Sequence, residues 1–440
     1  MSLKRQSEPF GIRCAYATLN DNPFLAGDEN SLIFESDGLV VIDHGLIHAA
    51  GHYNSLRPLF PELEIVQYQN ALLVPGFIDT HVHYPQLPMI GSYGEQLIDW
   101  LTRYTFETEQ RFCDIGYARR VADHFLDACL DAGTTTAAVY CTVHPESVDA
   151  FFAASLERGL RMLAGKVLMD RNAPAALLDT AQTGYDQSEQ LIRRWHGQHR
   201  LSYAITPRFA PTSTPAQLEA AGALRSAYPD VLVQTHLSEN PQEVAWVKSL
   251  FPERRHYLDV YAHYGLTGPR CIFGHALHLC ESEWRMLSDS GSSIAHCPTS
   301  NAFLGSGLFD LETARSCQPN MRLGLATDVG AGTTLSMLKT MGAAYSVAQL
   351  RGNALSPVKA FHMATYGAAQ ALHLEERIGR IAAGLEADLV ILDLQATPVI
   401  EQRMAQCSDI ADTLFVQMIL GDERSIRAVY SAGKSVKPAV

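Results

Sequence analysis

The middle of the chain alternates between short apolar runs and longer stretches with helical periodicity. Eight of the apolar runs are strand candidates, at residues 72–78, 134–140, 162–168, 202–206, 231–235, 271–274, 292–295 and 323–326. The stretches between them, such as 116–131 and 242–250, are long enough for a helix. This alternation is typical of parallel βα units. We therefore predict an α/β fold with a (β/α)8 TIM-like barrel over residues 71–379, somewhat longer than the roughly 250 residues usual for such barrels.

Both ends of the chain have a different pattern, with β-branched runs separated by tight turns. The run 39–42 is followed by Asp43-His44-Gly45 and a return run at 46–48, which predicts a hairpin. Near the C-terminus, 388–392 is a strand candidate, and 428–430 with 436 predicts a closing hairpin around Ala432-Gly433. We expect residues 1–70 and 380–440 to form one composite β-sandwich domain.

Composition excludes several classes of protein. With 47% hydrophobic and 18% charged residues, the 440-residue chain has ample material for a core. The net charge of −13, without a basic run, argues against nucleic acid as a partner. No apolar run is long enough for a membrane helix, and the polar N-terminus does not resemble a secretory signal. The nine cysteines are scattered without a CxxC pair, which favours reduced thiols and a cytoplasmic location.

The strongest chemical motif is His81-Val82-His83, directly after the first predicted barrel strand. Residues i and i+2 of a strand point to the same face, so the two imidazoles can bind one metal ion. Barrel enzymes hold their active sites at this end of the strands. Two solvated loop histidines would explain the motif alone equally well.

Three further polar residues end predicted barrel strands, and together they strengthen the metal hypothesis. His236, His275 and Asp328 follow the fifth, sixth and eighth strands. One such residue is explained as a cap, but packing does not require several imidazoles at one rim. Glu239, three residues after His236, is either an acid at the start of the next helix or a carboxylate within reach of a metal-activated water. Nitrogen and oxygen ligands without thiolates suit zinc, with iron second.

The order of these motifs resembles the amidohydrolase superfamily, and within it the guanine deaminases. The resemblance covers nearly the whole chain and is carried by DTHVHYPQ (79–86), PRFAP (207–211), HLSEN (236–240), CPTSN (297–301) and TDVGAGT (327–333).

The resemblance implies a zinc-dependent deamination of guanine. His81, His83, His236 and Asp328 would bind one Zn²⁺ per chain. A zinc-activated hydroxide would attack C2 of guanine, giving xanthine and ammonia. Glu239 would protonate N3 and then the leaving amine, while His275 holds the water and Asp328 accepts its proton.

The resemblance also implies which residues recognise the base. Gln86, Arg208, Phe209 and His236 would face it. Arg208 can donate hydrogen bonds to O6, Gln86 can donate and accept along a purine edge, and Phe209 offers a stacking face, unless it is simply a core aromatic. Trp100 is a candidate for a further wall. A homodimer is the family's usual state and is expected here.

The same residues give less support to alternative functions. A binuclear hydrolase would need a bridging lysine on the fourth strand, whereas Lys166 falls on the third. Another mononuclear deaminase, acting on cytosine or a triazine, lies closer, and Gln86 and Arg208 argue against it. A non-catalytic scaffold would be expected to lack the metal ligands and Glu239, which this chain has.

Overall fold

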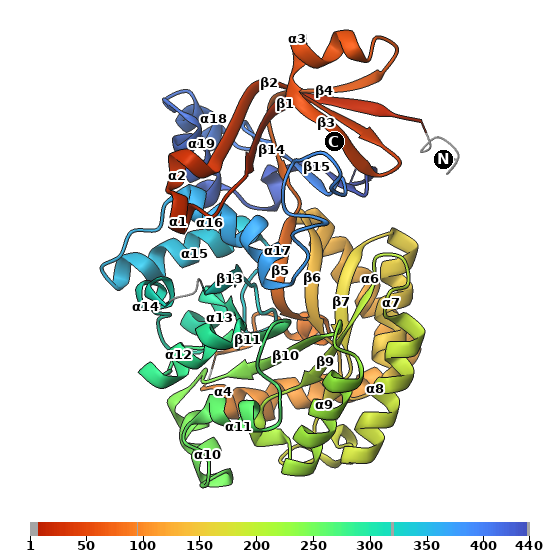
Figure 1. Ribbon diagram of the computed structural model, residues 1–440, viewed down its shortest axis with the longest axis vertical. Helices are drawn as coiled ribbons and strands as arrows, with labels where there is room; N and C mark the ends of the chain where they lie inside the picture. Colours follow the sequence, from red (N-terminus) through yellow and green to blue (C-terminus); the bar gives the residue numbers. More distant parts are fainter. Residues whose placement is uncertain (1–7, 95, 318–320, 438–440) are drawn as a thin grey trace.

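The computed structural model describes residues 8–94, 96–317 and 321–437, and its strands form two sheets (Figure 1). The middle of the chain builds a parallel barrel, and the two ends together build a separate sheet, so the predicted fold class is confirmed. The assignment of 1–70, 71–379 and 380–440 to domains stays a prediction. Residues 1–7 and 438–440, which it includes, lie outside the described residues.

The barrel strands follow one another around the sheet in chain order, and β8 pairs beside β9. They are β5 (Phe77–His83), β6 (Thr134–Tyr140), β7 (Arg161–Gly165), β8 (Val167–Leu168), β9 (Ser202–Pro207), β10 (Leu232–Leu237), β11 (Cys271–His275), β12 (Ser293–His296) and β13 (Arg322–Leu325). The last strand meets the first through side-chain and loop contacts: Thr80 Oγ1 donates to the Leu325 carbonyl at 2.9 Å, and the Asp328 N–H donates to the His81 carbonyl at 2.9 Å.

Apart from the two-residue β8, each barrel strand, or the residue just after it, contributes an apolar side chain to the interior. These residues belong to one buried cluster: Ile78, Ala138, Leu163, Ala204, Leu232, Ile272, Ala295 and Ala326. Half of them are alanine, which fits the limited space that eight strands enclose. The barrel is thus a packed core, and open space for a ligand occurs at its rim.

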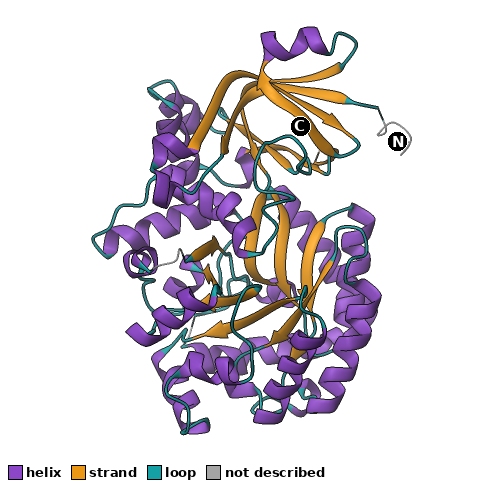
Figure 2. Ribbon diagram, in the orientation of Figure 1, coloured by secondary structure: helices purple, strands orange, loops and turns teal. Residues whose placement is uncertain are grey.

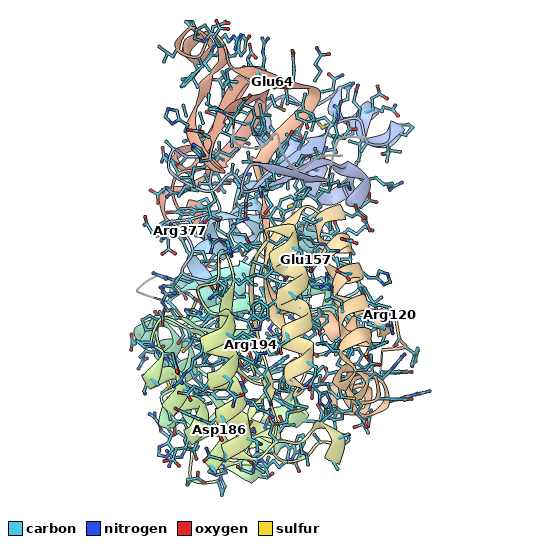
Figure 3. All side chains as sticks on the ribbon, turned by 90° about the vertical axis from the view of Figure 1, so that its right-hand side faces the viewer. Glu64, Arg120, Glu157, Asp186, Arg194 and Arg377 are labelled. Atoms are coloured by element: carbon cyan, nitrogen blue, oxygen red, sulfur yellow. The ribbon has the colours of Figure 1, made fainter. Side chains whose placement is uncertain are left out.

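Helices surround the barrel (Figure 2). The longer ones and their connections are α6 (Ile115–Asp131), α7 (Pro145–Arg158), α8 (Ala181–Trp195), α9 (Pro215–Ala227), α10 (Pro241–Leu250), α11 (Tyr257–His263), α12 (Glu281–Ser290), α13 (Pro298–Phe303), α14 (Leu311–Ser316), α15 (Met337–Leu350), α16 (Pro357–Ala364) and α17 (Tyr366–Ala371). They are amphipathic: α6 buries Val121 and Phe125, whereas Arg120, and Glu157 on α7, lie on the outside (Figure 3). The apolar stripes therefore pack on the barrel, as expected for surface helices.

The strands from both ends of the chain form one seven-stranded sheet, ordered β16-β15-β14-β4-β1-β2-β3. The strands are β1 (Phe10–Leu19), β2 (Leu32–Asp43), β3 (Leu46–His52), β4 (Glu64–Pro75), β14 (Leu389–Asp393), β15 (Ile426–Ser431) and β16 (Lys434–Lys437). The same two ends of the chain also contain helices, which are α1 (Pro23–Ala26), α2 (Asp28–Ser31), α3 (Tyr53–Leu56), α18 (Pro398–Met404) and α19 (Ile410–Leu420). Both predicted hairpins are present, and the first turns at His44 and Gly45, which have positive φ.

The prediction that Leu72–Ile78 forms a single barrel strand is wrong. Its first half completes β4 in the terminal sheet, and the barrel strand β5 begins at Phe77. The break falls at Gly76, where an added Cβ would lie 2.3 Å from the Thr135 hydroxyl oxygen. The apolar run is continuous because both halves are buried, so periodicity alone could not reveal the change of sheet.

All nine cysteines are free thiols, as the scattered spacing predicts. Among the helices that the structure describes, none is long and apolar enough to cross a membrane.

An ion-pair network joins the terminal sheet to the barrel, at the end opposite the predicted active site. Arg161, at the start of β7, and Arg200, just before β9, both donate to Glu386, with Nε distances of 2.9 Å. Arg200 also pairs with Asp388, which precedes β14. Burial raises the pKa of Glu386, but the two guanidinium groups outweigh it and lower the pKa overall.

We expect Glu386→Ala to lower the free energy of unfolding by about 3 kcal/mol, because it leaves the largely buried Arg161 without an ion-pair partner and Arg200 with Asp388 alone. Since the folded pKa is lowered, this stabilisation is complete at neutral pH and is lost as the pH falls through the carboxyl range. Urea unfolding at pH 7 and pH 4 would measure it. Glu312→Ala, which removes an exposed partner of Arg315, is the control and should change stability by less than about 0.5 kcal/mol.

Candidate active site

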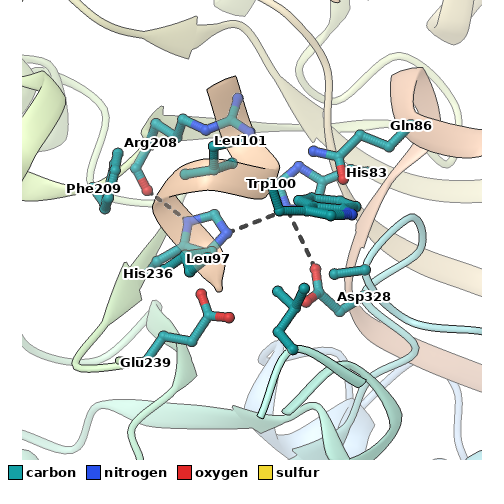
Figure 4. Close-up of a pocket in the computed structure, with 12 residues that line it drawn as sticks. His83, Gln86, Leu97, Trp100, Leu101, Arg208, Phe209, His236, Glu239 and Asp328 are labelled. Atoms are coloured by element: carbon teal, nitrogen blue, oxygen red, sulfur yellow. Dashed lines mark hydrogen bonds and ion pairs between the residues drawn. The ribbon is translucent and has the colours of Figure 1, made fainter. Parts of the chain in front are cut away.

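Five metal-ligand side chains from four barrel strands meet at one point at the carboxyl end of the barrel. His81 and His83 lie on β5, His236 on β10 and His275 at the end of β11, while Asp328 follows β13. All five are buried. Figure 4 shows His83, His236 and Asp328 converging on the floor of a pocket. The structure thus brings together every metal-site residue that the sequence singled out.

The distances between these side chains match those of ligands around one ion. The Nε2 atoms of His81 and His83 lie 3.3 and 3.4 Å from Asp328 Oδ1, and the Nε2 atoms of His83 and His236 are 3.2 Å apart. Two ligands at about 2.1 Å from a tetrahedral metal are about 3.4 Å apart.

The hydrogen-bonding state of the ring nitrogens also fits a cation. His81 Nε2 and His275 Nε2 are buried and have no hydrogen-bond partner. Such atoms are costly in a folded protein unless something else satisfies them. A divalent metal ion would accept these lone pairs. Within the described residues, the donor atoms of His81, His236, His275 and Asp328 all lie within 4.8 Å of one another.

Hydrogen bonds on the far side of two rings fix their orientation. His236 Nδ1 donates to the Arg208 carbonyl at 2.6 Å, and His275 Nδ1 donates to Asn301 Oδ1 at 2.8 Å. Both acceptors are oxygens, so each Nδ1 must carry the proton, and each Nε2 presents a lone pair to the centre. Asn301 is part of the CPTSN motif, but the sequence assigned it no role.

The backbone around the centre allows the close approach of β5, β11 and β13. Gly274 faces His81, and an added Cβ would lie 2.8 Å from the ring. Asp79 accepts a hydrogen bond from the Thr327 N–H at 3.0 Å and also binds the Thr327 hydroxyl. Asp328 follows with a positive φ of 51°.

Burial would raise the pKa of Asp328, but His81, His275 and His236 lower it to about 2, so its carboxylate stays ionised.

Glu239 is held at the edge of the centre by its own loop. Its backbone N–H donates to Glu243 at 2.8 Å, and Glu243 is itself held by the Tyr257 hydroxyl at 2.7 Å. The Glu239 carboxyl lies 3.4 Å from His275 Nε2 and 3.3 Å from the Ser306 hydroxyl. Burial raises the pKa of Glu239 to about 7, which suits a group that must both hold and release a proton at neutral pH.

The pocket above the centre contains the predicted base-binding residues. Gln86 comes from the 3-10 turn η2 (Tyr84–Met89), and Arg208 and Phe209 directly follow β9. The remaining wall is mostly apolar and consists of Leu97, Trp100, Leu101, Leu304 and Ala331. A largely apolar pocket with a few directed polar groups suits a flat heterocyclic ligand.

One buried residue behind the pocket wall was missed by the sequence analysis. Glu109, at the end of α5 (Phe106–Glu109), is fully buried. Its carboxylate accepts from Gln86 Nε2 at 3.1 Å and from Arg208 Nη1 at 2.7 Å. It lies in the polar stretch ETEQ, which resembles an exposed helix turn, so the sequence carries no signal of its burial.

Two other polar residues that the sequence singled out do not belong to the centre. The fully buried Lys166 pairs with Asp179 and contacts the Val167 carbonyl at 3.4 Å. His296, at the end of β12, stacks on Phe309 with ring centroids 4.6 Å apart. Lys166 is thus held by an ion pair and His296 by ring stacking, and the number of metal ions stays a prediction.

A (β/α)8 barrel that gathers histidines and an aspartate at the carboxyl ends of its strands defines a metal-dependent hydrolase. The chain belongs to the amidohydrolase family, whose model matches residues 72–436. This confirms the superfamily resemblance of its motifs.

Individual relatives are similar along nearly the whole chain. The guanine deaminase of Escherichia coli (strain K12) is 51% identical over 408 residues, which is 92% of each chain. A solved structure of the E. coli guanine deaminase matches with a TM-score of 0.95 and covers 98% of this chain and 99% of that one, at 48% identity. A guanine deaminase from C. acetobutylicum, solved with guanine in its active site, has a TM-score of 0.89 at 26% identity and covers 98% of this chain and 100% of its own.

The distances predict which of two histidines the protein needs to hold its metal ion. His83 Nε2 lies within 3.4 Å of two other donors, whereas His275 Nε2 is 3.7 Å from Asp328 and closer to Glu239. We expect His83→Ala to lose most of its metal and His275→Ala to keep about one equivalent per chain. Elemental analysis of both variants after gel filtration measures this. The opposite result would make His275 the fourth ligand.

Proposed function

We propose that this chain is a guanine deaminase, which hydrolyses guanine at C2 to xanthine and ammonia. The observation that carries the proposal is the pocket itself, which joins a buried metal-ligand set and Glu239 to Arg208 and Gln86. The similarity to guanine deaminases over 92% of the chain supports the same conclusion.

The metal ion is proposed to be Zn²⁺, held by His81, His83, His236 and Asp328. The support is a donor set of imidazoles and one carboxylate, without thiolates. When bound, such an ion acidifies water and so supplies a nucleophile at neutral pH.

The side chains around the base would perform the proton transfers. A bond forms between the water oxygen and C2, and the bond from C2 to the exocyclic nitrogen breaks. Glu239 passes the first proton of the water to N3 as the oxygen attacks, and it later passes the second proton, received from Asp328, to the departing amine. His275, 3.4 Å from the Glu239 carboxyl, would orient the water, and Asp328 would accept its second proton. Each hydrolysis thus consumes one water and releases one ammonia.

Recognition of guanine would use groups on the wall that carries Arg208 and Gln86. In Figure 4 these side chains lie on one side of the pocket, and Glu239 and Asp328 on the other. Arg208 offers N–H groups to O6, and Phe209, which lines the same pocket, offers a stacking face. Because an adenine ring has an amine in place of O6, it would leave buried donors unpaired. The homodimer and the cytoplasmic location stay predictions.

The direct test is an ultraviolet assay of the metal-loaded chain with guanine, adenine, cytosine and a triazine amine. We expect turnover of guanine with stoichiometric ammonia, and a kcat/KM at least about 1,000-fold lower for adenine, because adenine has no amine at C2 and its 6-amine would face Arg208. Turnover of cytosine or the triazine in preference to guanine would reject the proposal. A metal-loaded chain that hydrolyses none of them would favour the scaffold alternative.

Replacement of Glu239 separates chemistry from metal binding. We expect Glu239→Gln to keep its metal but to lower kcat by about 100- to 10,000-fold, because the amide cannot deliver a proton to N3. Single-turnover rates and elemental analysis measure both. The control is Glu253→Gln, on an exposed glutamate, which should retain the wild-type rate. Full activity of Glu239→Gln would remove this residue from the mechanism.

A further inference from the structure

Glu109 connects the two side chains that are proposed to recognise the base. One carboxylate oxygen accepts from Gln86 Nε2 at 3.1 Å, and the other accepts from Arg208 Nη1 at 2.7 Å. The residue is fully buried and is not among the side chains that line the pocket. It can therefore act on a ligand only through Gln86 and Arg208.

The Gln86 amide is held in one of its two orientations from both sides. The Glu109 carboxylate, which is paired with Arg208, can accept a hydrogen bond but cannot donate one. On the other side, the Gly330 N–H, which can only donate, binds Gln86 Oε1 at 3.2 Å. Gly330 permits this approach, because an added Cβ would lie 2.7 Å from the Gln86 carbonyl oxygen. A 180° flip of the amide would place the Gln86 NH₂ against the Gly330 N–H, and Gln86 Oε1 against the Glu109 carboxylate.

This constraint matters because guanine and its 6-amino analogue present opposite patterns on the edge that carries position 6. Guanine has an acceptor at O6 beside a donor at N1–H. 2,6-Diaminopurine has a donor at the 6-amine beside an acceptor at N1, and it retains the 2-amine of guanine. A freely flipping amide could pair with either edge, whereas an amide with one orientation distinguishes them.

We propose that Glu109 is a positioning residue that determines base specificity, because it fixes the Gln86 amide and the Arg208 guanidinium in the orientation that matches a 6-oxo purine. This inference rests on the proposed function, since it concerns the same pocket, and it names a determinant on α5, outside the motifs of the sequence analysis.

Glu109→Gln is the informative substitution because it preserves size and removes the fixed orientation. The new amide keeps its oxygen for Arg208, so its NH₂ faces Gln86 Nε2. If Gln86 flips to relieve that contact, its own NH₂ meets the Gly330 N–H. Each orientation then contains one mismatch, and neither is favoured.

The test measures binding in a chain that does not turn the ligands over. Guanine and 2,6-diaminopurine are titrated, by calorimetry or by fluorescence of Trp100, into metal-loaded Glu239→Gln and into Glu239→Gln/Glu109→Gln. We expect the single variant to prefer guanine, and the double variant to lose at least about tenfold of that preference. Both bases are neutral, so the altered charge of the pocket affects them alike and largely cancels in the ratio.

Two further variants separate specificity from stability. Glu283→Gln, in the same Glu239→Gln background, changes another buried glutamate, which accepts from the N–H groups of Leu258 and Cys280, and should leave the ratio unchanged. Glu109→Asp keeps the charge but is too short to reach both partners, so we expect its ratio of guanine to 2,6-diaminopurine affinity to be intermediate. It serves as the test if Glu109→Gln does not fold. Melting temperatures of all variants identify any loss of fold.

An unchanged ratio in both Glu109 variants would overturn the inference, as would an equal loss in Glu283→Gln or binding of neither base by Glu239→Gln. Failure of the proposed function has a different signature: the wild-type chain would not release ammonia from guanine, whatever the binding ratios are.

Discussion

The contact between the first and last barrel strands is the constraint on which the site depends. Asp79 on β5 binds the backbone and hydroxyl of Thr327, and the His81 carbonyl accepts from the Asp328 N–H. These bonds place residues from opposite ends of the barrel sequence side by side. His81 and His83 therefore lie close to Asp328.

The same closure explains how a buried carboxylate stays ionised. Burial, together with the nearby charge of Asp328, raises the pKa of Asp79 to about 7, despite the hydrogen bonds that Asp79 accepts from Thr327 and His81. Asp328 is equally buried, but the imidazoles around it lower its pKa to about 2. Asp79 and Asp328 thus have different roles because of their partners. Asp79 joins two strands, and Asp328 presents a negative charge to a cation.

Much of this arrangement could be predicted from the sequence, because it follows from topology. Parallel strands bring their carboxyl ends to one rim, so His236, His275 and Asp328 had to lie near His81. The change of sheet at Gly76 could not be predicted, since both flanking segments are apolar. The role of Glu109 could not be predicted either, because it depends on how the short helical turns between β5 and α6 pack. Its neighbours Glu107 and Gln110 give this stretch the polar pattern of an exposed helix.

The site therefore combines two kinds of structure with different tolerance to change. The metal ligands come from strand ends, whose positions are fixed by barrel closure and by the small residue Gly274 beside His81. The base-recognition groups come from the segment after β5 and the loop after β9, and Glu109 joins these two segments through buried hydrogen bonds. On the proposed function, we expect a substitution in the second set to alter which ring is bound while the metal centre stays intact. Substrate choice would then be separable from the hydrolytic chemistry, and Glu109 would couple the two segments that carry it.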